Sequence, residues 1–259
     1  MVGMTDSQCW TLSCQDRGTS TSDLAKAAVR EGAPAGSAFL LGEQTAGRGR
    51  QGRQWSSQPG GMYVSVLLYP SRSVNSWFAL SFAAALAIYD VVKTHLNEQI
   101  LQHDADLPIP TIGLKWPNDV LVNNRKVAGI LLEAQGKSLI IGSGVNINAI
   151  TAVDQNPHPP IALGDFPGIL PEAKQLAESY LKRLQFYYEL WERDGFAPVR
   201  DLWLGQALHM KQIISVNVSG QKLSGTCINL LDDGGLVLLD ETGTSHHITT
   251  GDVEMIGRY

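Results

Sequence analysis

A run of short apolar segments, separated by turns and not by helices, constrains the fold of this chain more than any other feature. The segments span 112–116, 120–122, 126–134 and 139–146. Turn-forming residues connect them, namely Pro117-Asn118-Asp119, Asn123-Asn124 and Gly136. Strands joined by such short turns pair with their neighbours along the chain, so we expect an antiparallel or mixed sheet.

Two long helical patterns flank this meander, at 76–96 and 172–193. Apolar residues recur in both at the spacing that places them on one helix face. Because a sheet with one apolar face must be covered, the sequence predicts an α+β fold with a central sheet covered by helices. Shorter elements are expected as helices at 22–30 (capped by Thr21 or Ser22) and 198–205, and as strands at 37–41 and 62–69. Residues 1–18 have no strong period, 97–110 read as a surface connection, and 151–168 read as a proline-rich loop.

The pattern changes after Leu208. Short apolar alternations follow at 213–218, 224–229, 236–239 and 245–248, separated by Gly- and Asp-rich turns and without a helical period. About five short strands in so few residues are typical of a small barrel, which hides strand edges by closing the sheet. We therefore expect two domains, 1–207 and 208–259.

Composition narrows the class of protein. A chain of 259 residues with 44% hydrophobic and 17% charged residues can bury a sizeable core, and its net charge of −5 disfavours a protein dominated by nucleic-acid contacts. The three cysteines do not form a zinc-binding pattern and read as packing thiols of a reducing compartment. The start of the sequence has no secretory signal pattern, and the apolar run at 78–92 is too short and polar for a membrane span. These features predict a cytoplasmic enzyme without a membrane partner.

The segment 47–55 carries the strongest functional signal. Gly47, Gly49 and Gly52 alternate with Arg48, Arg50 and Arg53, and Trp55 closes the segment. Glycine lets a ligand approach the backbone, and each guanidinium offers a donor fork that matches phosphate or carboxylate. We expect a loop that orders when an anion binds, although such loops also bind RNA or simply face solvent.

A second polar cluster, Lys115-Trp116-Pro117-Asn118-Asp119, lies where an apolar strand ends. A carboxylate beside a lysine can hold Mg²⁺ near phosphates, or it can accept a proton from an incoming amine. The same residues would also make an ordinary proline turn with a surface ion pair.

Two further segments combine glycine with polar groups. Residues 126–133 form a strand-like run with Lys126 at its start and Gly129 inside it, where interior glycine indicates close approach of another group. Residues 142–148 contain Gly142, Gly144 and Asn146 but lack the third glycine and the βαβ context of a dinucleotide site. We expect these small residues to pack against a flat ligand.

Together the four segments resemble the biotin–protein ligases. Gly-Arg-Gly-Arg-x-Gly-Arg-x-Trp, Lys-Trp-Pro-Asn-Asp, Lys-x-x-Gly-Ile-Leu-x-Glu and Gly-x-Gly-x-Asn-x-Asn occur here in the family's order and at similar spacing. The resemblance spans roughly residues 16–205. It implies the catalytic domain shared by biotin and lipoate ligases, which is similar to class II synthetases, followed by a small SH3-like β-barrel.

The resemblance also implies a reaction. Biotin and ATP, with Mg²⁺ and no tightly bound prosthetic group, give biotinyl-5'-AMP and pyrophosphate. The biotin then passes to a lysine of a biotin carboxyl carrier protein, such as that of acetyl-CoA carboxylase, and AMP leaves. Catalytic roles fall on Arg50, Lys115, Asp119 and Lys126, with Asp119 also the candidate metal ligand. Biotin contacts fall on Ser20, Thr21, Ser22, Gln44, Arg48, Gly49, Arg50 and Lys126. Nucleotide contacts fall on Gly47, Arg48, Arg50, Arg53, Trp55, Lys115, Asn118, Lys126 and Asn146.

Some features depart from the family pattern or stay open. The family often has Asn where this chain has Ser22, and Arg where it has Gln51. Some members carry an N-terminal DNA-binding helix-turn-helix, for which the residues before Ser20 are too few, so we expect a monofunctional ligase without a nucleic-acid partner. A lipoate–protein ligase, a Gly-Arg RNA-binding module and an inactive biotin sensor are the alternatives. A homodimer stays open, and the barrel could close over nucleotide or dock the carrier.

Overall fold

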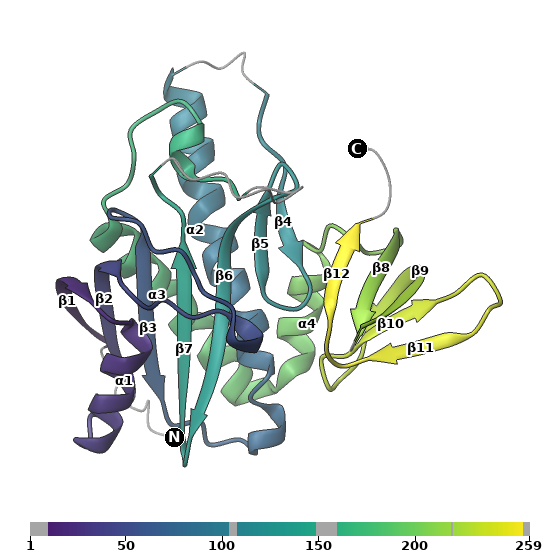
Figure 1. Ribbon diagram of the computed structural model, residues 1–259, viewed down its shortest axis with the longest axis horizontal. Coiled ribbons are helices and arrows are strands. Elements are labelled where there is room, and N and C mark those ends of the chain that lie inside the picture. Colours follow the sequence, from purple (N-terminus) through teal and green to yellow (C-terminus); the bar gives the residue numbers. More distant parts are fainter. Residues whose placement is uncertain (1–9, 104–107, 149–159, 219, 256–259) are drawn as a thin grey trace, which may run out of the picture.

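The computed structural model describes residues 10–103, 108–148, 160–218 and 220–255, which form two sheets (Figure 1). The larger sheet has the strand order β1-β2-β3-β7-β6-β5-β4. β1 runs parallel to β2 and every other neighbouring pair is antiparallel, so the sheet is mixed, as expected. Its strands are β1 (Thr11–Gly18), β2 (Ser37–Gln44), β3 (Met62–Leu68), β4 (Ile112–Lys115), β5 (Asp119–Val122), β6 (Arg125–Gln135) and β7 (Ser138–Val145).

Helices cover both faces of this sheet. α1 (Thr21–Arg30) packs on one face against β2, β3 and β7, where Ala25 meets Leu67 and Ile140. On the other face lie α2 (Ala79–His103) and α3 (Ala173–Asp194), and α4 (Phe196–Leu204) packs against both of them. Short 3₁₀ turns occur at Arg50–Gly52, Val74–Ser76 and Leu163–Asp165. The helices therefore leave the α1 face of β6 and β7 free for the loop that follows β2.

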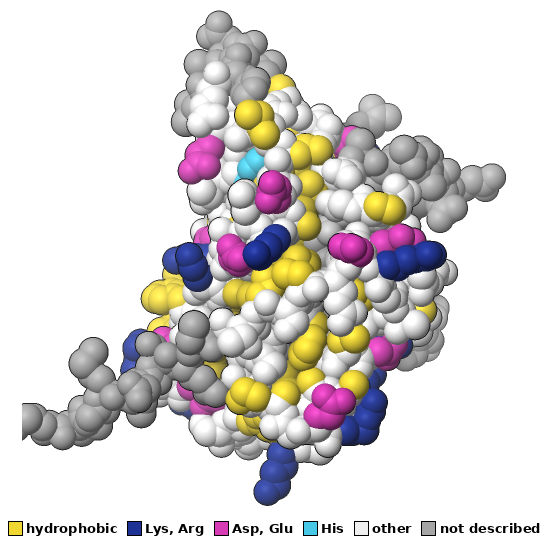
Figure 2. Space-filling view, turned by 90° about the vertical axis from the view of Figure 1, so that its left-hand side faces the viewer, with side chains coloured by type: hydrophobic (Ala, Val, Ile, Leu, Met, Phe, Trp, Pro, Cys, Tyr) yellow, Lys and Arg dark blue, Asp and Glu magenta, His cyan; other side chains and the backbone are white. Residues whose placement is uncertain are grey.

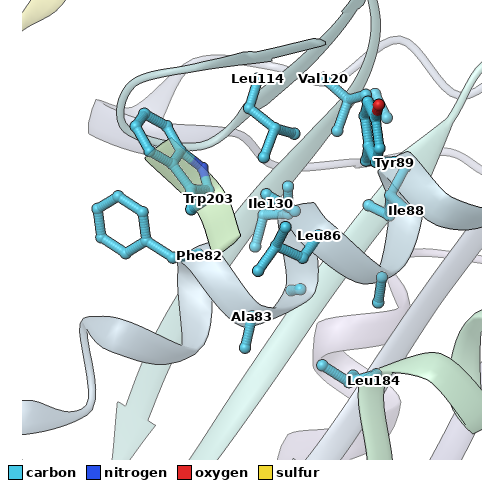
Figure 3. Close-up of a cluster of buried hydrophobic side chains, with 14 of the residues drawn as sticks. Phe82, Ala83, Leu86, Ile88, Tyr89, Leu114, Val120, Ile130, Leu184 and Trp203 are labelled. Carbon is cyan, nitrogen blue, oxygen red and sulfur yellow. The ribbon is translucent and has the colours of Figure 1, made fainter. Parts of the chain in front are cut away.

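α2 is the central helix of the core. Its alanines at 79, 83, 84 and 87 are fully buried, and such small side chains allow close packing between the sheet and α3. Around them Phe82, Leu86 and Trp203 fill the space beneath Leu114 and Ile130 (Figure 3). The segment Val74–Gln99 is long and apolar enough to cross a membrane, but 67% of its most apolar window is buried inside the molecule, so packing accounts for its composition.

The second sheet follows α4 and has the order β11-β10-β9-β8-β12, all antiparallel. This arrangement is consistent with a small SH3-like barrel, and it lies beside the β4 edge of the large sheet (Figure 1). Trp116 Nε1 donates a hydrogen bond to the Gly234 carbonyl oxygen at 2.9 Å, and Arg200 pairs with Asp232. The strands are β8 (Ile213–Val218), β9 (Gln221–Leu230), β10 (Leu236–Leu239), β11 (Ser245–Ile248) and β12 (Asp252–Met255).

The structure corrects several boundaries. Residues 11–18, which show no period, form the edge strand β1, whose side chains are mostly exposed on both faces. α2 extends to His103, beyond the expected end at 96, and α1 is capped by Ser20, whose side chain accepts a hydrogen bond from the Ser22 amide at 3.3 Å. Residues 151–159 of the expected loop lie outside the described residues. On the face that lies to the left in Figure 1, acidic and basic side chains are interspersed around an apolar strip (Figure 2).

Candidate functional site

A cleft lies on the α1 face of the large sheet, between the loop 47–55, the start of α1 and the first residue of β12. Its empty volume, which includes the solvent of its open mouth, is about 790 Å³. In Figure 1 the loop crosses in front of β7 and β6. The cleft therefore brings together the arginine loop, the start of α1 and the strands β6 and β7.

Glycines leave much of the floor of the cleft as bare backbone. Side chains of a strand alternate between faces, and β6 and β7 place Gly129, Gly142 and Gly144 on the cleft side. Gly129 and Gly144 are direct cross-strand partners. Ser143 points the other way, where its hydroxyl lies 2.7 Å from that of buried Tyr180 on α3, and burial raises the pKa of Tyr180. The alternation thus gives a flat surface above a well-packed core.

Trp55 covers this floor. A Cβ added to Gly144 would lie 2.7 Å from the indole Nε1, and one added to Gly129 would lie 3.0 Å from its Cζ3. Among the described residues, the buried Nε1 has no hydrogen-bond partner. Lys126 Nζ lies 5.1 Å from the indole centroid on the same floor, a cation–π distance. Only glycine at these two positions lets the ring approach so closely.

A polar network closes the end of the cleft near α1. Gln44 Oε1 accepts hydrogen bonds from the Thr21 amide at 2.9 Å and from the Thr21 hydroxyl at 3.2 Å. Its Nε2 donates to the Ser57 hydroxyl at 2.8 Å, and Ser57 donates in turn to the Trp55 carbonyl oxygen. Ser20, Thr21 and Ser22 are each at most 4% exposed. Donors and acceptors packed this way suit a small polar ring, and the network links them to the loop.

The arginines of the loop have partners from three different elements. The loop itself is a tight hairpin in which Gly49 N donates to the Arg53 carbonyl oxygen at 2.7 Å, with Gln51 (φ 56°) and Gly52 (φ 74°) at the tip. A left-handed conformation is unusual for a side chain such as that of Gln51. The pairs are Arg48 with Asp23 of α1, Arg50 with Asn118 of the β4–β5 turn, and Arg53 with Asp252 of β12.

These contacts differ in charge. Arg48 and Asp23 approach to 2.5 Å, and this bond lowers the pKa of the Asp23 carboxyl. Arg50 Nη1 instead donates to the neutral amide oxygen of Asn118 at 3.0 Å, so this contact does not offset its charge. Each of the three guanidinium groups therefore has an intramolecular acceptor in the absence of a bound anion. Arg50 is the loop arginine whose charge is least compensated by its bonded partner.

Lys126 and Asp119 form an ion pair at the centre of the cleft. Their Nζ and Oδ1 atoms lie 2.6 Å apart, and both side chains are only partly exposed. β5 and β6 bring them together, since a register shift between Val120 and Leu121 interrupts the pairing there. Asn118 is fixed by its Nδ2, which donates to the Ile130 carbonyl oxygen at 2.7 Å. An amine and a carboxylate thus meet directly above the glycine floor.

Most residues predicted for the site line this cleft, and three do not. Gly47 begins the loop and packs against its other end, where a Cβ would meet the Trp55 carbonyl oxygen at 2.5 Å, outside the lining of the cleft. Lys115 is at the end of β4, close enough to buried His209 to affect it electrostatically. Asn146 donates to the Ile161 carbonyl oxygen at 3.1 Å, outside the lining. The residues brought together are Ser20, Thr21, Ser22, Gln44, Arg48, Gly49, Arg50, Arg53, Trp55, Asn118, Asp119 and Lys126.

One cleft residue, Asp252, and three residues near its lining were not named from the sequence. Asp23, in the first turn of α1, pairs with Arg48, and Ser57 accepts a hydrogen bond from Gln44. Glu133 pairs with Lys26 at 2.5 Å beside Arg48; burial opposes its ionisation, but the bonds from Lys26 and Ser22 outweigh it and lower the pKa. Asp252 has no local signal, because it reaches the cleft only through the packing of the barrel.

Comparisons with known proteins identify the family of this chain. Residues 14–148 match the model of the biotin/lipoate A/B protein ligase family, and the chain belongs to that family. It is 33% identical to a biotin–[acetyl-CoA-carboxylase] ligase of Paracoccus denitrificans over 80% of this chain and 86% of the relative. A ligase of the same name from Mycobacterium tuberculosis is 31% identical over 91% and 85% of the two chains.

A solved structure has the same fold. It is the biotin protein ligase of Aquifex aeolicus in complex with biotin and ATP, with a TM-score of 0.78 and 26% identity. The match covers 94% of this chain and 97% of the other. Both the sheet with its helices and the C-terminal barrel are therefore included in the similarity.

Proposed function

We propose that this chain is a biotin–protein ligase that makes biotinyl-5'-AMP and transfers biotin to a lysine of a biotin carboxyl carrier protein, as in acetyl-CoA carboxylase. One observation carries the proposal: a flat glycine floor, Lys126 and a loop with three arginines converge on one cleft. The relatives named for biotin ligation and the similar structure holding biotin and ATP support the same reaction.

The first step joins two anions, and the cleft supplies positive charge for it. The biotin carboxylate attacks the α-phosphorus of ATP, so negative charge accumulates on the phosphoryl oxygens while pyrophosphate leaves. Arg50 and Lys126 lie where they can donate to these oxygens, and Arg48 can do so once it exchanges Asp23 for substrate. Fixed donors that face developing charge in a partly enclosed site lower the barrier because they need little reorganisation.

The ureido ring of biotin fits the polar end of the cleft. Ser20, Thr21 and Ser22 present hydroxyls there, and Gln44 is held in one orientation by its bonds to Thr21 and Ser57. A ring that must be hydrogen-bonded on several sides is selected over one that lacks those groups. This end supports biotin over lipoate, whose dithiolane ring offers no such donors.

Magnesium would accompany ATP. The ion usually binds through one or two carboxylates together with substrate phosphates, and Asp119 provides a carboxylate in the cleft. Among the described residues no cluster of three or more metal-binding side chains occurs. When bound there, Mg²⁺ would neutralise phosphate charge; the chain itself would hold it through Asp119.

In the second step the amine of the carrier lysine forms an amide bond with the biotinyl carbonyl, and AMP leaves. The incoming amine must be neutral to attack, and Asp119 can accept its proton once Lys126 turns to the carbonyl oxygen of the adenylate. The adenylate hydrolyses readily in water, so Trp55 and the loop serve as its cover. Lys115 and Asn146 would act from outside the lining, by supporting the β4–β5 turn and the end of β7.

The proposal has further parts. We place the catalytic domain at residues 1–207 and the barrel at 208–259, with biotin, ATP and the carrier domain as partners and neither nucleic acid nor membrane among them. A reducing, cytoplasmic setting suits Cys14 and Cys227, which are free thiols. The homodimer of the sequence-based prediction stays a prediction.

The decisive experiment uses a purified biotin carrier domain. Incubation of the chain with Mg-ATP, biotin and that domain should add the mass of one biotin, less water, to the carrier. Lipoate in place of biotin should give no shift on a lipoyl domain. A shift with lipoate alone would overturn the proposal in favour of a lipoate ligase.

A further inference from the structure

Asp252 is the residue of the C-terminal barrel that reaches the cleft. It is the first residue of β12, where it pairs in register with Asn217, and it lies 199 positions from Arg53 in the sequence. Its carboxylate contacts the Arg53 guanidinium across the mouth of the cleft. The loop and the barrel are thus connected directly, although they belong to different sheets and different ends of the chain.

The loop depends on contacts of this kind for its position. Residues 50–52 at its tip bury no side chain, so no apolar packing holds the tip against the protein. Two of its arginines connect it to the large sheet and to α1, while Arg53 connects it to the barrel. Loss of the Arg53 contact would leave the barrel side of the mouth without this connection.

Arg53 can bind Asp252 and still offer donors to a ligand in the cleft. Its bonds to Asp252 and to Gln51 both use Nη2, and no described residue accepts a hydrogen bond from Nη1 or Nε. Asp252 raises the pKa of Arg53 by this bond and by its charge. A guanidinium is a rigid fork, so fixing one nitrogen also fixes the direction of the others. Arg53 held in this way keeps donors available for an oxygen in the cleft.

We propose that Asp252 is a positioning residue for adenylate chemistry: it clasps Arg53 so that the barrel holds the loop over the bound intermediate. The proposal rests on the function proposed above and adds a residue and a role to it. A purely structural role is a poor explanation, because the Arg53 and Asp252 side chains are 62% and 41% exposed, and such ion pairs contribute little to folding. The effect of the pair is therefore on the position of the loop.

The test compares Asp252→Asn, Asp252→Glu, Arg53→Gln and the Asp252→Asn/Arg53→Gln double variant. Glu254→Gln is the matched control. Glu254 lies two residues further along β12, on the same strand face, and pairs with Lys222 of β9 on the surface of the barrel. Two quantities are measured: hydrogen–deuterium exchange of residues 47–55 without ligand, and the rate at which preformed biotinyl-5'-AMP escapes into solution.

Asp252→Asn should raise both the loop exchange and the escape rate by about two- to fivefold, the range expected for an exposed ion pair. Arg53→Gln should raise the loop exchange by the same factor and the escape rate by at least as much, because it also removes donors that face the cleft. The double variant should match Arg53→Gln in both quantities, and Asp252→Glu should keep both values close to those of the unaltered chain. Glu254→Gln should match the unaltered chain. Additive effects in the double variant, or unchanged loop exchange in Asp252→Asn, would overturn the clasp.

The exchange measurement needs no substrate, so it separates two failures. If the unaltered chain makes no biotinyl-5'-AMP, the proposed function is wrong, yet the exchange data still decide whether Asp252 holds the loop. If the adenylate forms and the exchange of Asp252→Asn equals that of the unaltered chain, the clasp is wrong and the function stands.

Discussion

A methyl group on the cleft floor should disable the site without unfolding the protein. In Gly144→Ala the added Cβ would lie 2.7 Å from Trp55 Nε1 and 2.8 Å from its Cε2. Ordinary contact between such atoms needs about 3.6 Å, so the indole must move by about 1 Å. Lys126, which lies 5.1 Å from the ring centroid, shares that space. A displacement of about 1 Å in positioning groups lowers rates by about 100-fold.

The assay is biotin-dependent pyrophosphate release, with thermal unfolding measured in parallel. Gly144→Ala should lose about 100-fold in adenylate formation while its Tm changes by no more than a few degrees, because the indole lies over a cleft and not in the core. Gly205→Ala is the structural control: its nearest contact would be an ordinary 3.4 Å, far from the cleft. Activity of Gly144→Ala within twofold of the unaltered chain would show that the position of the Trp55 indole does not control adenylate formation.

Three other outcomes are expected. Asp119→Asn removes the partner of Lys126 and the proton acceptor, so single-turnover transfer from preformed adenylate, which needs no ATP, should fall by about 100-fold; an unchanged transfer rate would contradict this role. Tyr180→Phe should cost about 1–2 kcal/mol in urea unfolding because it leaves the buried Ser143 hydroxyl without its partner; an unchanged midpoint would show that the bond contributes nothing. Burial and, to a smaller extent, the charge of Lys115 lower the pKa of the His209 imidazole to about 4 in the folded chain. As the pH falls, the imidazole is therefore protonated in the unfolded chain before it is protonated in the folded chain, and this favours unfolding. Stability should drop by up to about 3 kcal/mol between pH 6.5 and 4, and His209→Leu should show a shallower slope over that window.

The sequence predicted the strands of the meander well because each has a buried face. β10 and β11 begin and end at the expected residues, and β4 to β7 agree within one residue at each end. β1 escaped detection for a physical reason: it is an edge strand with Cys14, Gln15 and Asp16 all exposed, so no face needs to be apolar. The cap of α1 moved to Ser20 because hydroxyls in succession offer several equivalent caps.

The part of the candidate site that comes from short local motifs was predicted from the sequence. Lys126 and Asp119 were named from separate segments and lie 2.6 Å apart, since β5 and β6 are hairpin neighbours. Lys115 lies outside the lining because adjacent positions at a strand end point in different directions. Asp252 could not be found from the sequence at all, because its place depends on how the barrel docks against the β4 edge.

The most direct test of the account is retention of the intermediate. The purified chain is mixed with biotin and Mg-ATP labelled on the α-phosphate, without carrier, and passed quickly through a desalting column. We expect about one equivalent of biotinyl-5'-AMP bound to each chain, dependent on biotin and not formed with lipoate. Labelled AMP appearing only free in solution, or no biotin-dependent adenylate at all, would contradict the claim that this cleft forms and shelters the acyl-adenylate.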